Sequence, residues 1–246
     1  MFYKCIRNLN QTIPQRTLST MNRPPPIFNL GIKLIVCDMA GTTIKENGIV
    51  YKILRNAMNH HGMNISHKEI QPWHGASKNE VLYHFCQKYS NIIEQEQINK
   101  TFEDMIQKEY NKKNSISLIP NLSNWIHKCQ FIGIKVALNT GYSSTIQKDI
   151  LKKLELDTMV DHWISSSDVT NGRPYPYMIY HIMEQANILN ISNVAKVGDT
   201  VNDIYEGRNA GCGLVIGVLS GADSSSDLYQ AGADFVIPDI THLKPY

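Results

Sequence analysis

Long apolar runs are absent from this sequence of 246 residues: no stretch approaches the roughly 20 consecutive apolar residues that a membrane-spanning helix requires. Strong compositional bias is absent too, since 42% of the residues are hydrophobic and 19% are charged. These proportions exclude a disordered chain, a collagen-like repeat and a coiled coil. We therefore expect a soluble globular protein that does not interact with membranes.

Acidic residues are missing from the first 37 positions, which carry five basic residues. The rest of the chain holds 19 basic and 22 acidic residues, so the body of the protein is weakly acidic. Proteins that bind nucleic acid usually present a basic face, so this balance argues against a nucleic-acid partner. The five cysteines are widely spaced and include no Cys-x-x-Cys pair, which favours free thiols in a reducing compartment and argues against a zinc site.

Residues 1–29 carry few signals of regular structure. They contain Arg, Ser and Thr, no acid, and the run Pro24-Pro25-Pro26. This composition resembles a mitochondrial presequence. A plain disordered tail is the alternative, because Pro14 interrupts any amphipathic helix. The sequence thus predicts either a cytoplasmic or a mitochondrial protein.

Strands and helices alternate in the body of the chain. The apolar run 32–37 predicts a buried strand, and further strands are expected at 134–138, 162–165, 194–197, 213–218 and 235–237. Helices are expected between them, at 122–130, 145–153, 174–186 and 202–210. Such alternation predicts an α/β fold, in which a parallel sheet is covered on both faces.

Residues 44–119 interrupt this alternation. They show apolar stripes with helical spacing, such as Ile53, Leu54, Ala57 and Met58, and we expect no strand among them. A helical block inserted after the first strand predicts a cap over the sheet. The expected division is a core domain of residues 30–43 and 120–246, and a helical cap domain of residues 44–119.

Residues that suit phosphoryl chemistry follow several of the predicted strands. In open parallel sheets, ligands bind at the carboxyl ends of the strands. Carboxylates there would suit Mg²⁺, and a hydroxyl, backbone N–H groups and an arginine would suit a phosphoryl group. The segments concerned are Asp38-Met39-Ala40-Gly41-Thr42-Thr43, Asn139-Thr140-Gly141-Tyr142, Gly172-Arg173-Pro174 and Gly198-Asp199-Thr200-Val201-Asn202-Asp203.

These segments resemble, in order, the four motifs of the haloacid dehalogenase superfamily, and the resemblance covers residues 32 to about 240. Most phosphatases of that superfamily have Asp-x-Asp in the first motif and a lysine in the third. Here Ala40 stands at the second acidic position and Arg173 replaces the lysine. Both departures are also those of phosphonoacetaldehyde hydrolase (phosphonatase) and its phosphonatase-like relatives, which the sequence therefore resembles. A haloacid dehalogenase-type Rossmannoid core is the fold that the resemblance implies.

The resemblance also implies roles for individual residues. Asp38 would be the nucleophile, and Asp38, the Ala40 carbonyl and Asp199 would bind Mg²⁺. Asp203 would orient this site or add a ligand. Thr140 and Arg173 would bind the phosphoryl oxygens. Further residues expected to line the substrate are Thr42, Gly75, Gly141 and Tyr142.

The absence of an acid at position 40 bears on the leaving group. In phosphatases of this type the second Asp protonates the leaving oxygen, which Ala40 cannot do. Phosphonatases break a C–P bond, and the resemblance implies a cap lysine that forms a Schiff base with the substrate aldehyde. Gly75-Ala76-Ser77-Lys78 resembles the Gly-x-x-Lys segment that carries it. Two departures are His74, where the family has Met, and Val81, where the family has a proton-shuttling His.

The sequence thus predicts a Mg²⁺-dependent hydrolase that cleaves the C–P bond of phosphonoacetaldehyde or a related 2-oxoalkylphosphonate, through an aspartyl-phosphate at Asp38 and a Schiff base at Lys78. One alternative is an ordinary phosphatase for a small phosphate ester, against which Ala40 argues. The other is a non-catalytic binding protein, against which the presence of Asp38 and Asp203 argues. A homodimer formed through the cap is also implied by the resemblance.

Overall fold

A parallel sheet forms the centre of the computed structural model, which describes residues 24, 26–46, 48–89, 95–113 and 115–246. In this part of the chain the six strands of the sheet are arranged in the order β5-β4-β1-β6-β7-β8. All their pairings are parallel, which confirms the predicted α/β core. The strands are β1 (Leu34–Asp38), β4 (Lys135–Thr140), β5 (His162–Ser165), β6 (Val194–Gly198), β7 (Leu214–Val218) and β8 (Phe235–Ile237).

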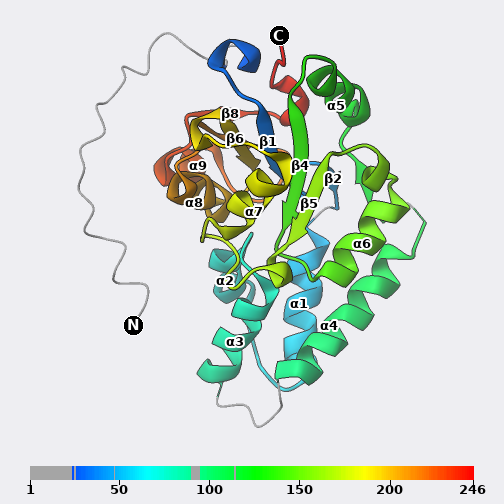
Figure 1. The fold of residues 1–246 in the computed structure, drawn as a ribbon. Coiled ribbons are helices and arrows are strands. Elements are labelled where there is room, and N and C mark those ends of the chain that lie inside the picture. Colours follow the sequence, from blue (N-terminus) through cyan, green and yellow to red (C-terminus); the bar gives the residue numbers. More distant parts are fainter. Residues whose placement is uncertain (1–23, 25, 47, 90–94, 114) are drawn as a thin grey trace.

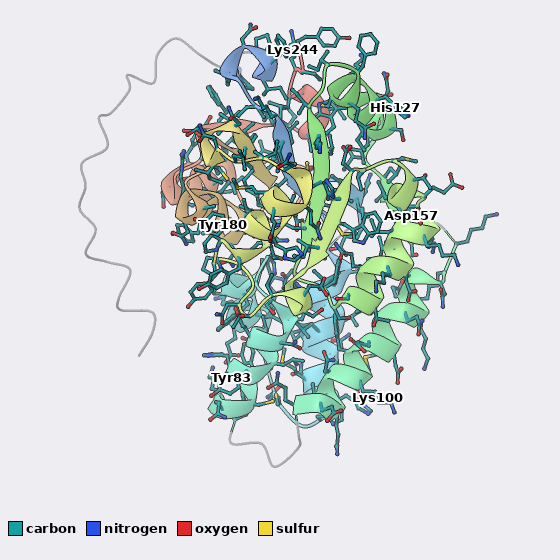
Figure 2. All side chains as sticks on the ribbon, in the orientation of Figure 1. Tyr83, Lys100, His127, Asp157, Tyr180 and Lys244 are labelled. Atoms are coloured by element: carbon teal, nitrogen blue, oxygen red, sulfur yellow. The ribbon has the colours of Figure 1, made fainter. Side chains whose placement is uncertain are left out.

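Helices cover both faces of the sheet, as β1 shows. Leu34 and Val36 pack in one apolar cluster with α7 (Tyr177–Ala186), α8 (Val201–Ala210) and α9 (Ser225–Ala231). Ile35 and Cys37 pack in another with α5 (Leu122–Phe131) and α6 (Ser144–Lys153). Successive strand side chains point to opposite faces, so a strand covered on both sides is apolar throughout. Charged side chains such as Lys100, Asp157 and Lys244 lie at the periphery (Figure 2).

Helix boundaries follow the predictions except at α7, which begins at Tyr177 rather than at residue 174. The reason is a turn over residues 172–175, closed by a hydrogen bond from the Tyr175 N–H to the Gly172 carbonyl. Short 3₁₀ helices fill several connections of the body: Leu156–Thr158, Ser166–Asp168, Ile191–Asn193 and Ile240–His242.

The predicted insertion consists of helices that lie below the sheet in Figure 1. They are α1 (Ile49–His60), α2 (His67–Ile70), a 3₁₀ turn (Gln71–Trp73), α3 (Lys78–Lys88) and α4 (Gln95–Tyr110). The expectation of no strand in 44–119 is wrong, because β2 (Ile44–Lys45) pairs with antiparallel β3 (Ser117–Leu118). Strands of two residues are too short to leave a periodic pattern in the sequence. This small sheet joins the two chain segments that connect the helices α1–α4 with the core.

The predicted N-terminal tail ends earlier than expected. Residues Ile27–Leu30 form a 3₁₀ helix, the Ile27 N–H donates to the Lys244 carbonyl, and Ile27 is fully buried. The prediction of disorder is therefore wrong for residues 27–29, because an apolar anchor ties them to the C-terminal segment. Residues 1–23 and 25, on which the presequence prediction rests, lie outside the described residues. Within the described ranges, every helix is too short or too polar to traverse a lipid bilayer.

Candidate active site

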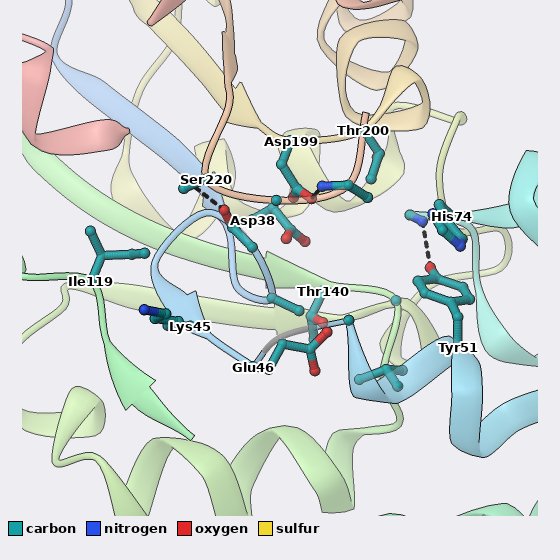
Figure 3. A pocket seen from close by; sticks show the side chains of 18 of the residues that line it. Asp38, Lys45, Glu46, Tyr51, His74, Ile119, Thr140, Asp199, Thr200 and Ser220 are labelled. Carbon is teal, nitrogen blue, oxygen red and sulfur yellow. Dashed lines mark hydrogen bonds between the residues drawn. The ribbon is translucent and has the colours of Figure 1, made fainter. Parts of the chain in front are cut away.

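A cavity of about 590 Å³ lies between the carboxyl ends of the strands and the helices α1–α4. Figure 3 shows Asp38, Thr140 and Asp199 contributed by the core, and Glu46, Tyr51 and His74 contributed by the inserted segment. The cavity is lined by every residue of the predicted site except Thr42 and Asp203. The predicted residues that line it are Asp38, Ala40, Gly75, Lys78, Thr140, Gly141, Tyr142, Arg173 and Asp199.

Three buried carboxylates meet at the sheet end of the cavity. Asp38, Asp199 and Asp203 each bring an oxygen within 4.8 Å of the others. Thr42 does not line the cavity but contacts Asp199, since its Oγ1 donates to Asp199 Oδ1 over 3.1 Å. Burial raises the pKa of Asp199 well above its ordinary value, and the charges of Asp38 and Asp203 raise it further. A cation bound here would relieve this repulsion.

Arg173 forms ion pairs with two of these carboxylates. Its Nη2 lies 2.6 Å from Asp38 Oδ1, and its Nη1 lies 2.8 Å from Asp203 Oδ1. Burial raises the pKa of Asp38, whereas the Arg173 charge lowers it. For Asp203, Arg173 and Lys196 outweigh burial and bring the pKa below its ordinary value. Arg173 thus engages one oxygen of Asp38, which lines the cavity, while Asp203 is held ionised.

Asp203 has its oxygens engaged by the protein. Oδ1 lies within ion-pair distance of Arg173 and of Lys196, and Oδ2 accepts hydrogen bonds from the Thr200 backbone N–H and hydroxyl. The Thr200–Asp203 pair is also the capping box at the start of α8. This geometry fits the predicted orienting role of Asp203 better than that of a direct metal ligand.

An ion network that the sequence did not indicate supports this arrangement. Lys196, in the middle of β6, contacts Asp203 at 2.9 Å, Glu206 at 3.1 Å and Asn139 Oδ1 at 2.8 Å, and it is fully buried. A lysine within an otherwise apolar strand was the available signal. With Asp38, Asp199 and Arg173, the network has four carboxylates and two cations, a formal charge of −2. An all-oxygen donor set with this excess charge fits Mg²⁺.

Lys78 is buried on the opposite side of the cavity, with 7% of its surface exposed. Its Nζ lies 2.8 Å from the Tyr51 hydroxyl and 3.3 Å from the Ala76 carbonyl. It also lies 4.3 Å from the centre of the Tyr51 ring and 5.5 Å from that of Tyr142. Burial, followed by the charge of Arg173, lowers the pKa of Lys78 to about 8. A substantial share of this amine is therefore neutral near physiological pH.

Contacts with the core fix the position of Lys78. It is the first residue of α3, and its backbone N–H donates to the Gly141 carbonyl over 3.2 Å. Gly75 has φ +77°, and a Cβ there would lie 2.1 Å from Thr200 Oγ1. Only glycine can bring this loop so close to the core. The roles of Gly75 and Gly141 that the geometry supports are thus to seat the lysine against the sheet.

Neither of the positions that depart from the phosphonatase pattern offers a ready proton donor. Val81 is fully buried in the apolar core and does not line the cavity. His74 lines the cavity and packs against the Tyr51 ring, with 4.2 Å between the ring centres. Burial, followed by the charge of Lys78, lowers the pKa of His74 to about 4, so its ring is neutral near physiological pH.

Two further cavity residues were missed by the sequence analysis. Tyr51, on α1, contacts Lys78 as described above. Glu46 is a buried carboxylate that accepts hydrogen bonds from the hydroxyls of Tyr110 and Tyr142. Burial raises the pKa of Glu46 to about 7. No local pattern marks either residue, because their neighbours come from distant parts of the chain.

Curated relatives share sequence over most of the chain. A phosphonoacetaldehyde hydrolase from Syntrophobacter fumaroxidans is 28% identical over 206 residues, which cover 78% of this chain and 74% of that protein. A bifunctional phosphonoacetaldehyde hydrolase/aminoethylphosphonate transaminase from Clostridioides difficile is 26% identical, covering 89% of this chain. The alignment covers only 40% of that longer protein.

Solved structures share the fold. A hydrolase from Pseudomonas syringae superposes with a TM-score of 0.75 at 20% identity, covering 86% of this chain and 95% of that one. A phosphonoacetaldehyde hydrolase-like protein from Oleispira antarctica gives 0.70 at 21% identity, covering 91% and 92%. The family model described as haloacid dehalogenase-like hydrolase matches residues 35–217, from β1 into β7. The chain belongs to the haloacid dehalogenase-like hydrolase family.

Proposed function

We propose that this protein hydrolyses the C–P bond of a small 2-oxoalkylphosphonate such as phosphonoacetaldehyde. The observation that carries the proposal is Lys78, a buried amine that faces the same cavity as Asp38. A lysine whose pKa is lowered to about 8 is suited to attack an aldehyde, since only the neutral amine is nucleophilic. The phosphonoacetaldehyde hydrolases among the curated relatives support the same substrate class.

The sheet side of the cavity would perform the phosphoryl half of the reaction. Asp38 would attack phosphorus to form an aspartyl-phosphate, while Thr140 and Arg173 would bind the phosphonate oxygens. Asp38, Asp199 and the Ala40 carbonyl would hold Mg²⁺, which when bound supplies positive charge against the phosphonate. Water would then hydrolyse the aspartyl-phosphate and release inorganic phosphate.

The helical side would perform the carbon half. Lys78 would add to the substrate aldehyde and, with loss of water, form an iminium ion. When phosphorus transfers to Asp38, the electron pair of the C–P bond would move into the iminium and leave a neutral enamine. Protonation at carbon and hydrolysis would then release acetaldehyde from phosphonoacetaldehyde and regenerate the amine. This route needs no acid at position 40, which agrees with Ala40.

Borohydride trapping tests the proposal. Wild-type protein incubated with phosphonoacetaldehyde and borohydride should carry a reduced adduct on Lys78, identified by peptide mass spectrometry. Lys78→Arg keeps the charge but cannot form the imine, so phosphate release from this substrate should fall by at least about 10³-fold. Lys88→Arg, a change at an exposed lysine of the same helix, is the control and should behave as wild type.

A panel of phosphate esters assayed beside phosphonoacetaldehyde separates the alternatives. Undiminished phosphate release by Lys78→Arg would refute the imine route and favour an ordinary phosphatase. Turnover of neither substrate class by the wild-type protein with Mg²⁺ present would favour a binding protein.

A further inference from the structure

Glu46 is a buried carboxylate that the reaction described above leaves without a role. It lies between β2 and α1, has 7% of its surface exposed, and lines the cavity (Figure 3). Lys78 lines the same cavity. It does not belong to the cluster of Asp38, Asp199 and Asp203 that is suited to a metal. Burying a carboxylate is costly unless it is paired or protonated, so its position needs an explanation.

The hydrogen bonds of Glu46 leave one oxygen available. Tyr110 and Tyr142 donate to the same atom, Oε2, over 2.8 and 3.0 Å. Among the residues that the structure describes, none donates a hydrogen bond to Oε1. The two tyrosines therefore orient the carboxyl group through Oε2, and no described residue competes with a cavity ligand for proton exchange at Oε1.

Tyr142 connects Glu46 with Lys78. The centre of its ring lies 5.5 Å from Lys78 Nζ, while its hydroxyl contacts Glu46. The two charged groups also influence each other: the Lys78 ammonium acts to lower the pKa of Glu46, and the Glu46 carboxylate acts to raise that of Lys78. The other groups that act on the Glu46 carboxyl are the hydroxyls of Tyr110 and Tyr142 and the charge of Asp38.

Imine formation requires proton transfers beside Lys78. When the amine adds to the aldehyde, the resulting carbinolamine hydroxyl must gain a proton to leave as water. Val81 has no ionisable group, and the ring of His74 is already neutral near physiological pH. Glu46, with a pKa of about 7, is poised both to give and to take a proton at that pH.

We propose, building on the function proposed above, that Glu46 is the acid–base residue of the imine chemistry at Lys78. The protonated carboxyl group gives its proton to the carbinolamine hydroxyl, the C–O bond breaks, and water and the iminium ion form. The Glu46 carboxylate then takes a proton from the water that attacks the iminium at the end of the reaction. No net proton is gained or lost by Glu46 over one turnover.

A purely structural role makes a different prediction. Glu46 precedes α1 and Tyr110 ends α4, so their hydrogen bond joins the two segments that connect the helices with the core. If this link were its only role, Glu46→Gln should behave nearly as wild type, because the amide oxygen can still accept from both tyrosines.

Reductive labelling of Lys78 by acetaldehyde and cyanoborohydride is the test, because it reports imine formation without any phosphoryl step. The full-length wild type, Glu46→Gln, Glu46→Asp and Glu109→Gln are compared by peptide mass spectrometry. Labelling in Glu46→Gln should slow by about 100-fold. Glu46→Asp should recover part of the rate, and Glu109→Gln, at an ion pair with exposed Lys112, should leave it unchanged.

The pH profile and the thermal stability complete the experiment. The rate of Lys78 labelling in the wild type should decline as the pH rises and Glu46 deprotonates, and this decline should be absent in Glu46→Gln. Both proteins should unfold at similar temperatures. Labelling of Glu46→Gln at the wild-type rate would overturn the proposal and leave the Lys78 mechanism intact. Failure to label Lys78 in the wild type would instead overturn the proposed function itself.

Discussion

The sheet side and the helical side of the cavity hold their charged groups in opposite ways. On the sheet side, Arg173 and Lys196 are surrounded by carboxylates, so each of these two buried cations has a partner within a short distance. On the helical side, Lys78 contacts a hydroxyl, a carbonyl and aromatic rings, and it forms no salt bridge with any residue that the structure describes. Pairing keeps Arg173, Lys196 and Asp203 ionised, whereas burial and the charge of Arg173 lower the pKa of Lys78.

This difference matches the chemistry that each side would perform. A phosphoryl group carries negative charge throughout, and permanently charged, rigid groups are suited to bind it. An amine that attacks an aldehyde must be neutral for that step and positively charged as an iminium later. A weakly paired lysine can make that change because neither state is fixed by a nearby charge. Each prediction below changes one residue of one side.

Replacing Asp38, the proposed nucleophile, should have the largest effect. Asp38→Asn should reduce phosphate release from any substrate by at least about 10³-fold, because the amide cannot form the aspartyl-phosphate. Reductive labelling of Lys78 by acetaldehyde should persist, since that step needs no group on the sheet side. Phosphate release and peptide mass spectrometry measure the two halves separately. Full phosphate release by this variant would refute the assignment of Asp38.

Removing a buried cation from the sheet side should cost more stability than any change on the surface. Lys196→Met leaves Asp203 and Glu206 with only Arg173 as a cationic partner, and we expect a loss of about 3–5 kcal/mol in the free energy of unfolding. Lys88→Met, which removes an exposed ion pair with Glu69, should cost less than about 1 kcal/mol. Urea denaturation compares the two. Equal losses would mean that the buried network contributes no more than a surface pair.

How far the two sides could be predicted from sequence follows from the same difference. On the sheet side, Asp38 and Thr140 are the last residues of β1 and β4, and Asp199 follows directly after β6, so local sequence both forms the strand and places the side chain. The neighbours of Lys78 are set by how the inserted helices dock on the core. Tyr51 is 27 positions before it, and its hydroxyl reaches Nζ only because α1 and the loop at Gly75 pack together.

Other features that the sequence analysis did not predict also have physical causes. Strands β2 and β3 have two residues each, which is less than one period of strand alternation. Lys196 resembles an ordinary interruption of an apolar strand until its partners on α8 and β4 are known. Residues 27–29 directly follow the run Pro24-Pro25-Pro26, which predicts that they belong to the tail, but buried Ile27 and the hydrogen bonds to the Lys244 and Pro245 carbonyls anchor them to the core.

The isolation of Lys78 should appear as a pH dependence of stability. Its pKa is about 8 in the folded protein, against the ordinary 10.5, so the unfolded chain binds more protons between these values. Stability should therefore rise with pH in this window as the buried ammonium loses its proton. Between pH 8 and pH 9.5 the gain should be about 1.5 kcal/mol relative to Lys78→Met, which lacks the titrating group. Denaturant unfolding at both pH values would measure it, and identical pH dependence in the two proteins would show that Lys78 keeps its ordinary pKa.

The smallest effect is expected at Tyr51, which positions Lys78 without reacting itself. Its hydroxyl accepts hydrogen bonds from Lys78 Nζ and from the Gly75 N–H, so it fixes both the amine and the loop that carries it. Tyr51→Phe removes one acceptor from each donor but keeps the ring beneath the ammonium. A lost hydrogen bond of this kind costs about 1 kcal/mol, and we expect labelling of Lys78 by acetaldehyde to slow by roughly fivefold to tenfold. Tyr83→Phe, at an exposed position of α3, is the matched control and should label at the wild-type rate. If Tyr51→Phe also labelled at the wild-type rate, the aromatic rings and the burial of Lys78 would be sufficient to position the amine without this hydrogen bond.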